Sequence, residues 1–254
     1  MAQPIVVEGI VLSTIRYGES SRIARLATRE LGVQSVIAKG ALRPRSRFGG
    51  GLQPLSIGQG MVVLSARSEL HLLTGFDLLH LPAGLAAVMD RYAAGLALAE
   101  VMLRFAPAGV HEPSYQGFKR ALLELEVTAP ASAEVVGLHW LWQLIGVLGF
   151  APDLRQCVLD GAAVPVEGPL PFSLTEGGAL CPACARSHAV TWLPEADRAD
   201  LIRVLAGTDD LPVMERSHAA AHRRLLGRYL RHQLGGDADL PALDFWQQRS
   251  WEAA

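Results

Sequence analysis

Residues 35–55 read SVIAKGALRPRSRFGGGLQPL, and the rest of the chain can be interpreted outward from them. The stretch begins as an apolar strand and then carries four cations within nine residues: Lys39, Arg43, Arg45 and Arg47. Cations neutralise phosphates, an aromatic face such as Phe48 stacks on unpaired bases, and glycines allow close backbone approach. The stretch therefore predicts a mobile loop that contacts nucleic acid. The alternative is an ordinary solvated hairpin loop.

Strand signals surround this loop from Ile5 to about His80. The five runs are residues 5–12, 22–28, 33–39, 61–65 and 70–75. They are β-branched or alternate between apolar and polar residues, as half-buried strands do. Five short strands predict a small barrel of the OB type, a fold that binds oligonucleotides on one face and its loops. The alternative is a barrel that serves only as a scaffold.

Helical periodicity replaces the strand pattern after residue 80. Apolar residues recur at intervals of three and four from Leu85 to Leu103, and Ser114 is the predicted N-cap of a second helix. A third helix starts at Ser132, and its apolar face predicts the centre of a core. The fold class is therefore α+β: an OB domain over residues 1–80 and a helical domain over residues 81–254, with a zinc-ribbon-like insertion at about 151–188.

The last predicted helix covers about residues 213–234 and ends before Gly235. Three arginines share one of its faces: Arg224, Arg228 and Arg231. A basic helix face is more often merely solvated, but here the local charge balance is also positive. The tail beyond the helix, with Trp246 and Trp251, either docks by its aromatic side chains or stays mobile.

The chain contains three cysteines, all between residues 151 and 188. The candidate metal ligands are Cys157, Asp160, Cys181 and Cys184, with His188 as an alternative fourth ligand. A Cys-x-x-Cys-Gly knuckle paired with Cys-x-x-Cys binds zinc tetrahedrally, and here Asp160 stands at the second position of the first knuckle. The two hypotheses are a Zn²⁺ site and a ribbon that has lost its metal.

Composition and charge exclude several classes of protein. Half of the residues are hydrophobic, so the chain is not disordered. We expect no secretory signal, no disulfide framework and no membrane span, and a cytoplasmic, nucleoid-associated protein. The net charge of −2 hides two basic regions, residues 1–80 and 211–232, each with a balance of +4. For binding to a polyanion such local charge matters more than the net charge, because salt screens charges beyond roughly 10 Å.

Motifs for catalysis are not apparent. The sequence lacks a Walker A loop and a Gly-x-Ser-x-Gly elbow, and no Gly-x-Gly-x-x-Gly opens a helix after a strand. Zinc deaminases place a His-x-Glu upstream of their Cys-x-x-Cys, whereas His111 and Glu112 are adjacent. We therefore expect no enzyme. A nucleic-acid-modifying enzyme remains the least favoured of the alternatives.

A series of short motifs runs along the barrel region: Tyr17-Gly18-Glu19-Ser20-Ser21, Thr28, Gly32, Ala38-Lys39-Gly40-Ala41, Ser46, Leu52-Gln53-Pro54 and Leu70. With these motifs the chain resembles the RecO family of bacterial DNA repair proteins. The order then continues with a helical domain and a late cysteine segment, so the resemblance covers essentially the whole chain. Asp160 departs from the family pattern, because zinc-bearing members have cysteine there.

The resemblance implies a DNA repair and recombination mediator. Such a protein binds single- and double-stranded DNA and anneals complementary strands. With RecR, and in many bacteria RecF, it helps to load RecA onto DNA coated by single-strand-binding protein, whose C-terminal tail it also binds. The resemblance gives the tail pocket as a hydrophobic patch with basic residues, without locating it in this sequence.

We expect DNA to contact the barrel, the basic loop and the last helix. The predicted DNA-binding residues are Arg16, Arg22, Arg25, Lys39, Arg43, Arg45, Arg47, Arg224, Arg228 and Arg231. Contacts should go mainly to phosphates, because annealing leaves the base edges free to pair. The alternative function is a non-catalytic adaptor whose OB fold contacts a partner protein rather than DNA.

Overall fold

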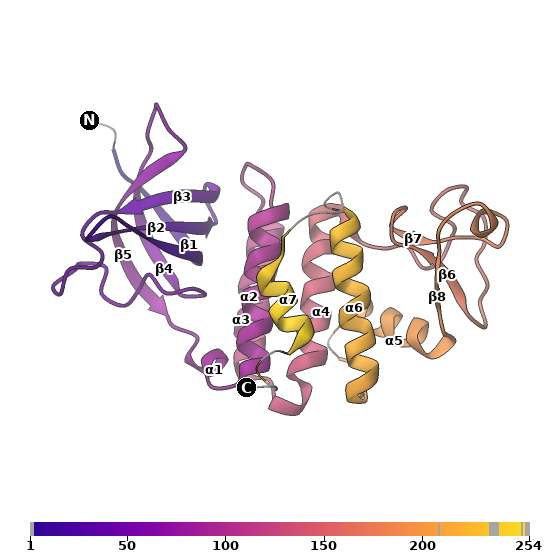
Figure 1. Cartoon of the computed structure of the whole chain (residues 1–254). Helices are drawn as coiled ribbons and strands as arrows, with labels where there is room; N and C mark the ends of the chain where they lie inside the picture. The colour runs from indigo at the N-terminus through magenta and orange to yellow at the C-terminus, as the bar shows by residue number, and fades with distance from the viewer. Residues whose placement is uncertain (1–2, 208, 234–238, 250, 252–254) are drawn as a thin grey trace. The chain divides into compact units, whose positions relative to one another are not determined.

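The computed structural model describes residues 3–207, 209–233, 239–249 and 251 of the chain. It divides into two compact units, residues 1–127 and 128–254, which we describe separately (Figure 1). The first unit contains the predicted barrel and three helices, and the second contains the remaining helices and a small sheet.

A closed five-stranded barrel occupies the start of the first unit, as predicted (Figure 1). Its strands are β1 (Ile5–Tyr17), β2 (Ser21–Thr28), β3 (Gly32–Ala38), β4 (Ile57–Val63) and β5 (Leu70–His80). Their order is β1-β2-β3-β5-β4, with β3 and β5 parallel and the other neighbours antiparallel. The long β1 pairs with β4 and with β2, and a bulge between Val11 and Ser13 bends it. One curved strand thus closes the barrel.

Alternation along the strands decides which side chains fill the barrel. The inward residues are Val7, Val11, Ala24, Leu26, Val36, Ala38, Val62, Leu73 and Phe76. Two residues of the connection between β3 and β4, Phe48 and Leu52, join the same core. The side chains between the inward ones, such as Ile23 and Arg25 on β2, face outward and are available for a binding surface.

Three helices complete the first unit: α1 (Ala83–Ala86), α2 (Met89–Phe105) and α3 (Glu112–Val127). Tyr115 of α3 donates a hydrogen bond to the Glu8 carboxylate of β1 at 3.0 Å, and Lys119 pairs with the same carboxylate. These contacts attach α3 to the barrel, so the compact unit extends to Val127. The domain boundary at residue 80 marks the change from strands to helices and stays a prediction.

Ser114 is not the N-cap of α3, and that prediction is wrong. The helix begins at Glu112, which places Ser114 in the first turn, where it is buried. Its hydroxyl donates to the carbonyl of His111 at 3.0 Å. A serine that bonds back to the carbonyl three residues earlier satisfies itself without capping the helix.

The second unit is built on α4 (Ala133–Ile145), which follows a 3₁₀ turn at Pro130–Ser132 and continues as a π-helical turn at Gly146–Phe150. Its other helices are α5 (Glu195–Ala206), α6 (Arg216–Gln233) and α7 (Pro241–Gln248). Three short strands form a sheet in the order β7-β6-β8: β6 (Leu170–Ser173), β7 (Gly178–Ala179) and β8 (Thr191–Leu193). As predicted, the apolar residues of α4 are buried, including Leu138, Leu141 and Trp142.

By length and composition alone, Pro130–Phe150 qualifies as a candidate membrane span, the single such helix within the described residues. Within the most apolar 18-residue segment of this helix, 61 % is buried inside the structure, which is typical of a core helix in a folded unit. The tail is docked as well, because Leu243 and Trp246 of α7 are buried. Gly235, predicted to follow the last helix, lies outside the described residues.

Candidate nucleic-acid interface and metal centre

A groove of about 570 Å³ runs across the outer face of the barrel. It is lined by outward residues of β1, β2 and β3, by the connection from β4 to β5 and by the first residue of β5: Ser13, Ile15, Ile23, Arg25, Ser35, Ser68, Glu69 and Leu70. Strand pairing explains why they meet, because Ser13 is opposite Arg25, and Arg25 is opposite Ser35. OB folds bind oligonucleotides at this position, on the face of the second and third strands beside the last interstrand loop.

Two arginines lie in and beside this groove. Arg25 is half-buried at its centre, and its Nε has no hydrogen-bond partner in the described part of the chain. Arg67 lies in the β4–β5 connection and lines the adjoining hollow together with Gln34 and His71. Sequence reasoning missed Arg67. The signal was its position in the last interstrand loop, where an OB fold places ligand contacts.

The basic loop between β3 and β4 is a series of turns that closes one end of the barrel. Backbone N–H groups donate to carbonyls three residues earlier at Arg43, Ser46, Gly49 and Gly51. Phe48 is 2 % exposed and packs in the barrel core, so the prediction that its ring is free to stack on a base is wrong. The turns direct the ring inward, because an apolar side chain there covers the open end of the barrel.

The cations of the loop remain on the surface. Lys39, Arg43, Arg45 and Arg47 are all exposed. The loop is also tied to the β1–β2 connection, because the Leu42 N–H donates to the Ser20 carbonyl at 2.8 Å. Along β3, Lys39 lies only four residues beyond Ser35 of the groove, roughly 13 Å at about 3.3 Å per residue. The loop therefore begins near one end of the groove, and its four cations are exposed to solvent.

Arg16 and Arg22 are placed differently from Arg25. They pair with each other across β1 and β2 at the barrel end, next to Ala38. Arg22 donates to the Leu52 carbonyl at 3.0 Å, so it supports the loop. Arg16 is exposed and reaches the carbonyls of the β1–β2 turn. Alternation places both on the other side of the strands from the groove residues.

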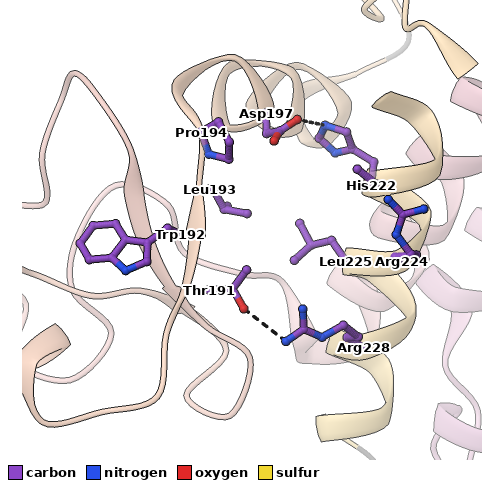
Figure 2. Close-up of a pocket in the computed structure, with 10 residues that line it drawn as sticks. Thr191, Trp192, Leu193, Pro194, Asp197, His222, Arg224, Leu225 and Arg228 are labelled. Atoms are coloured by element: carbon purple, nitrogen blue, oxygen red, sulfur yellow. Dashed lines mark hydrogen bonds and ion pairs between the residues drawn. The ribbon is translucent and has the colours of Figure 1, made fainter. Parts of the chain in front are cut away.

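In the second unit, the three arginines of α6 do not form one free face. Arg224 and Arg228 are exposed and line a pocket of about 170 Å³ between α6 and β8 (Figure 2). Arg228 donates to the Thr191 hydroxyl at 3.3 Å. Arg231 pairs instead with Asp244 of α7. Figure 2 also shows Leu193 and Leu225 in the gap between β8 and α6. The pocket therefore combines two cations with an apolar floor.

The cysteine segment brings all four predicted ligands together. One ligand atom each from Cys157, Asp160, Cys181 and Cys184 lie within 4.8 Å of one another. The Asp160 Oδ2 is 3.4 Å from the Cys181 sulfur and 3.3 Å from the Cys184 sulfur. A tetrahedral zinc ion with ordinary Zn–S and Zn–O lengths separates such a pair by about 3.6 Å. The donor set and its spacing fit a zinc ion.

Two tight turns position these residues. Gly161 has a φ of +72°, which glycine adopts without strain, and its N–H donates to the Cys157 carbonyl at 2.9 Å. The Cys184 N–H donates to the Cys181 sulfur at 3.4 Å. The alternative ligand His188 is turned elsewhere, because its Nδ1 lies 3.0 Å from the Cys184 carbonyl oxygen. The fourth position is therefore occupied by the carboxylate.

The ionisable groups of this cluster shift one another's pKa values. Hydrogen bonding from the Cys157 thiol, aided by the Ala162 N–H, lowers the pKa of Asp160 to about 2. The Asp160 carboxylate in turn raises the pKa of the Cys184 thiol to about 12. A bound cation reverses the second effect, since it favours the thiolate. The residues present could therefore hold a metal ion, which would join the two turns.

These features define a class: an OB-barrel protein with a helical unit and a cysteine cluster of metal-site geometry. Residues 1–82 match the family description "Recombination protein O N terminal", and residues 87–240 match "Recombination protein O C terminal". The chain belongs to the RecO family, whose role is in DNA repair and recombination.

Individual relatives agree with this assignment. "DNA repair protein RecO" of Anaeromyxobacter sp. (strain Fw109-5) is 31 % identical over 92 % of this chain and 93 % of the relative. The proteins of the same name from Rubrobacter xylanophilus and Thermobifida fusca are 35 % and 34 % identical over 71 % and 74 % of this chain, and over 71 % and 76 % of their own lengths. The predicted resemblance is confirmed.

Proposed function

We propose that this protein is a non-catalytic recombination mediator that binds single- and double-stranded DNA and anneals complementary strands. With RecR, and with RecF where present, it helps to load RecA onto DNA coated by single-strand-binding protein. The observation that carries the DNA-binding step is the groove on the outer barrel face, with Arg25 at its centre and Arg67 at its edge. Shape and charge both suit a nucleic-acid strand.

Annealing places a physical requirement on this surface. The strand has to be held by its phosphates, because its base edges must stay free to pair with the second strand. The groove offers Arg25, beside Glu69, and small polar side chains such as Ser13, Ser35 and Ser68. With Phe48 buried, aromatic stacking contributes less than the sequence predicts, and phosphate contacts contribute more. Binding should therefore be sequence-tolerant and strongly dependent on salt.

The test replaces Arg25 and Arg67 together with alanine. We expect weaker single-strand binding, a log–log salt slope lower by about 1.4, at about 0.7 per phosphate contact, and slower annealing. The control is Arg29→Ala, because Arg29 is also exposed but pairs with Glu112 outside the groove. Unchanged affinity and slope would place DNA elsewhere. If the unsubstituted protein binds a partner protein but no DNA even at low salt, the adaptor function replaces the proposed DNA-binding function.

We also propose that the pocket between α6 and β8 receives the C-terminal tail of single-strand-binding protein. The support is its combination of Arg224 and Arg228 with the apolar Leu193 and Leu225, which corresponds to the hydrophobic patch with basic residues expected for the family (Figure 2). Arg224→Ala/Arg228→Ala should abolish binding of a tail peptide in fluorescence anisotropy and leave the barrel's DNA affinity nearly unchanged. Retained peptide affinity would contradict this placement.

Zinc is the metal that we propose for the cysteine cluster. Metal analysis of the purified protein should find a bound ion that Asp160→Ala removes, because the carboxylate lies among the thiols. His188→Ala is the matched control and should retain the ion, since His188 faces away from the cluster. An absence of cluster-bound metal in the unsubstituted protein would identify a degenerate ribbon.

A further inference from the structure

A second group of metal-ligand side chains lies in the second unit, apart from the cysteines. His218 and His222 are four residues apart on α6, so they occupy one face of the helix. Asp197 of α5 faces them, and one ligand atom from each of the three lies within 4.8 Å of the others. Figure 2 shows Asp197 opposite His222 at one end of the pocket.

The spacing of His222 and Asp197 matches two ligands of one ion. The His222 Nε2 is 3.6 Å from the Asp197 Oδ1, too far for a hydrogen bond. With metal–ligand lengths of about 2.1 Å, two donors of one tetrahedral ion are about 3.4 Å apart. The His218 Nε2 contacts the same oxygen directly, so this pair has to separate when both bind one ion. The two imidazole rings are 5.0 Å apart between centroids. Both Nε2 atoms thus converge on one carboxylate.

A simple ion pair accounts for only part of this group. His218 and Asp197 satisfy each other, but His222 is 2 % exposed and neither ring nitrogen has a hydrogen-bond partner among the described residues. A buried polar group without a partner costs about 1–3 kcal/mol. Such an imidazole, aimed at a carboxylate beyond hydrogen-bond reach, is accounted for if an ion lies between them.

Asp200 adds a second carboxylate beside His218. Its Oδ2 is 3.5 Å from the His218 Nδ1, longer than an ordinary hydrogen bond. The negative charge beside Nδ1 favours the tautomer that carries its proton there and leaves the Nε2 lone pair free to bind a metal. Asp200 is therefore a positioning residue. It lies one turn beyond Asp197 on α5, so a single helix provides both the ligand and its support.

We propose that His218, His222 and Asp197 bind a divalent first-row transition-metal ion, distinct from any ion in the cysteine cluster. Two imidazoles and one carboxylate suit Zn²⁺ and its neighbours rather than Mg²⁺ or Ca²⁺, which prefer oxygen ligands. The ion joins α5 to α6 and borders the pocket that Asp197 and His222 also line. Three protein ligands leave at least one coordination position for water or a ligand.

The test uses tag-free, full-length protein, stripped with a chelator and equilibrated with Zn²⁺. Bound metal is counted by mass spectrometry in the unsubstituted protein and in Asp197→Asn and His218→Gln, two part-exposed and near-isosteric changes that should fold. We expect each variant to bind one ion fewer per chain. The control is His232→Gln, an exposed histidine near the end of α6, and it should bind as many ions as the unsubstituted protein.

Cobalt distinguishes this site from the cysteine cluster. Co²⁺ bound to thiolates has intense charge-transfer absorption that a site of histidine and aspartate lacks. We expect Asp197→Asn to lose one Co²⁺ and keep the cluster's thiolate absorption, and Cys181→Ser to lose that absorption and keep the other ion. Equal metal content in the unsubstituted protein, Asp197→Asn and His218→Gln would overturn the proposal, whatever the cysteine cluster binds.

Discussion

The basic loop of residues 39–51 and the helix α6 look alike in sequence, but their arginines differ in exposure and in ion pairing. Each segment has arginines at regular spacing within a positively charged region. In the loop, every cation is exposed and the one aromatic ring is buried. In α6, Arg223 is buried against Glu134, Arg231 pairs with Asp244, and Arg224 and Arg228 line a pocket.

The difference shows that a local excess of cations is not the same as free positive charge. Carboxylates distant in sequence neutralise two of the α6 arginines, and those carboxylates cannot be assigned before the fold is known. The loop turns its cations outward because its apolar residues are needed to close the barrel. The loop is therefore the stronger candidate for phosphate contacts. Four predictions test this comparison, from the largest expected effect to the smallest.

Arg223→Met should give the largest effect, on stability. Arg223 is 5 % exposed and pairs with Glu134, which also accepts from Arg249 at 2.9 Å. Removing one partner of a buried ion pair costs about 3–5 kcal/mol, because the other is left buried with less compensation. Urea unfolding measures the loss. The neighbouring exposed Arg224→Met is the control and should stay within about 0.5 kcal/mol. Equal costs for the two variants would contradict the comparison.

Phe48→Ala tests whether the loop is a structural closure of the barrel. Truncating a buried phenylalanine costs about 3–5 kcal/mol through lost burial and the cavity that remains. Arg47→Ala, one residue earlier and exposed, should be nearly neutral for thermal stability. If Phe48→Ala leaves stability unchanged and lowers DNA affinity instead, the ring contacts DNA, and the sequence-based expectation of base stacking is restored.

Replacing Arg43, Arg45 and Arg47 with alanine should weaken DNA binding without unfolding the protein. We expect a loss of about 10- to 100-fold in single-strand affinity and a salt slope lower by about 2, from three phosphate contacts. Fluorescence anisotropy across a salt series gives both quantities. The comparison variant is Arg231→Ala, whose guanidinium is engaged by Asp244, and its slope should change little. Equal slopes for the two variants would remove the distinction between loop and helix.

Glu8 gives a smaller, pH-dependent effect in the first unit. A hydrogen bond from Lys119, a second from Tyr115 and nearby positive charge lower the pKa of Glu8, against the opposing effect of burial. Because the folded pKa lies below the unfolded value, this stabilisation is present above the unfolded pKa and is lost as the pH falls through the folded pKa.

Glu8→Gln should therefore reduce stability by about 1 kcal/mol at pH 7. The difference from the unsubstituted protein should shrink below about pH 4.5, near the pKa of an unperturbed glutamate. Chemical denaturation at several pH values measures it, with the exposed Glu19→Gln as control. A pH-independent difference would show that Glu8 acts by packing rather than by charge. The expected pH dependence would also show that Lys119 is a cation already paired within the fold.

Much of the architecture was predictable because it depends on local periodicity. Alternating residues such as Ala24, Arg25 and Leu26 predict a half-buried strand, and the apolar residues of α4 predict a core helix. The cysteine cluster was predictable for a similar reason. Asp160 stands at the spacing of a knuckle ligand, so a short-range pattern identified it, and the structure places it among the three thiols.

Other features depended on contacts that no local pattern encodes. Arg67 and Arg25 border the same groove because β5 lies beside β3, a pairing of strands far apart in the chain. The site of His218, His222 and Asp197 needs α5 and α6 to pack together, and spacing on α6 alone provides only two of its three ligands. Ser114 is a case in which a local pattern misled the prediction. Serine is a common N-cap residue, but Ser114 lies within the first turn of α3.

The sequence by itself determined the barrel, the helical unit, the residues of the cysteine cluster and the family. Each of these features follows from the periodicity of apolar residues or from short motif spacings, which can be recognised within a short stretch of the chain. Only the tertiary structure decided that Phe48 faces inward, that Arg223 is buried while Arg224 is exposed, and that the two histidines of α6 meet Asp197. Burial and charge compensation depend on which distant segments come within a few ångströms, and folding alone specifies those.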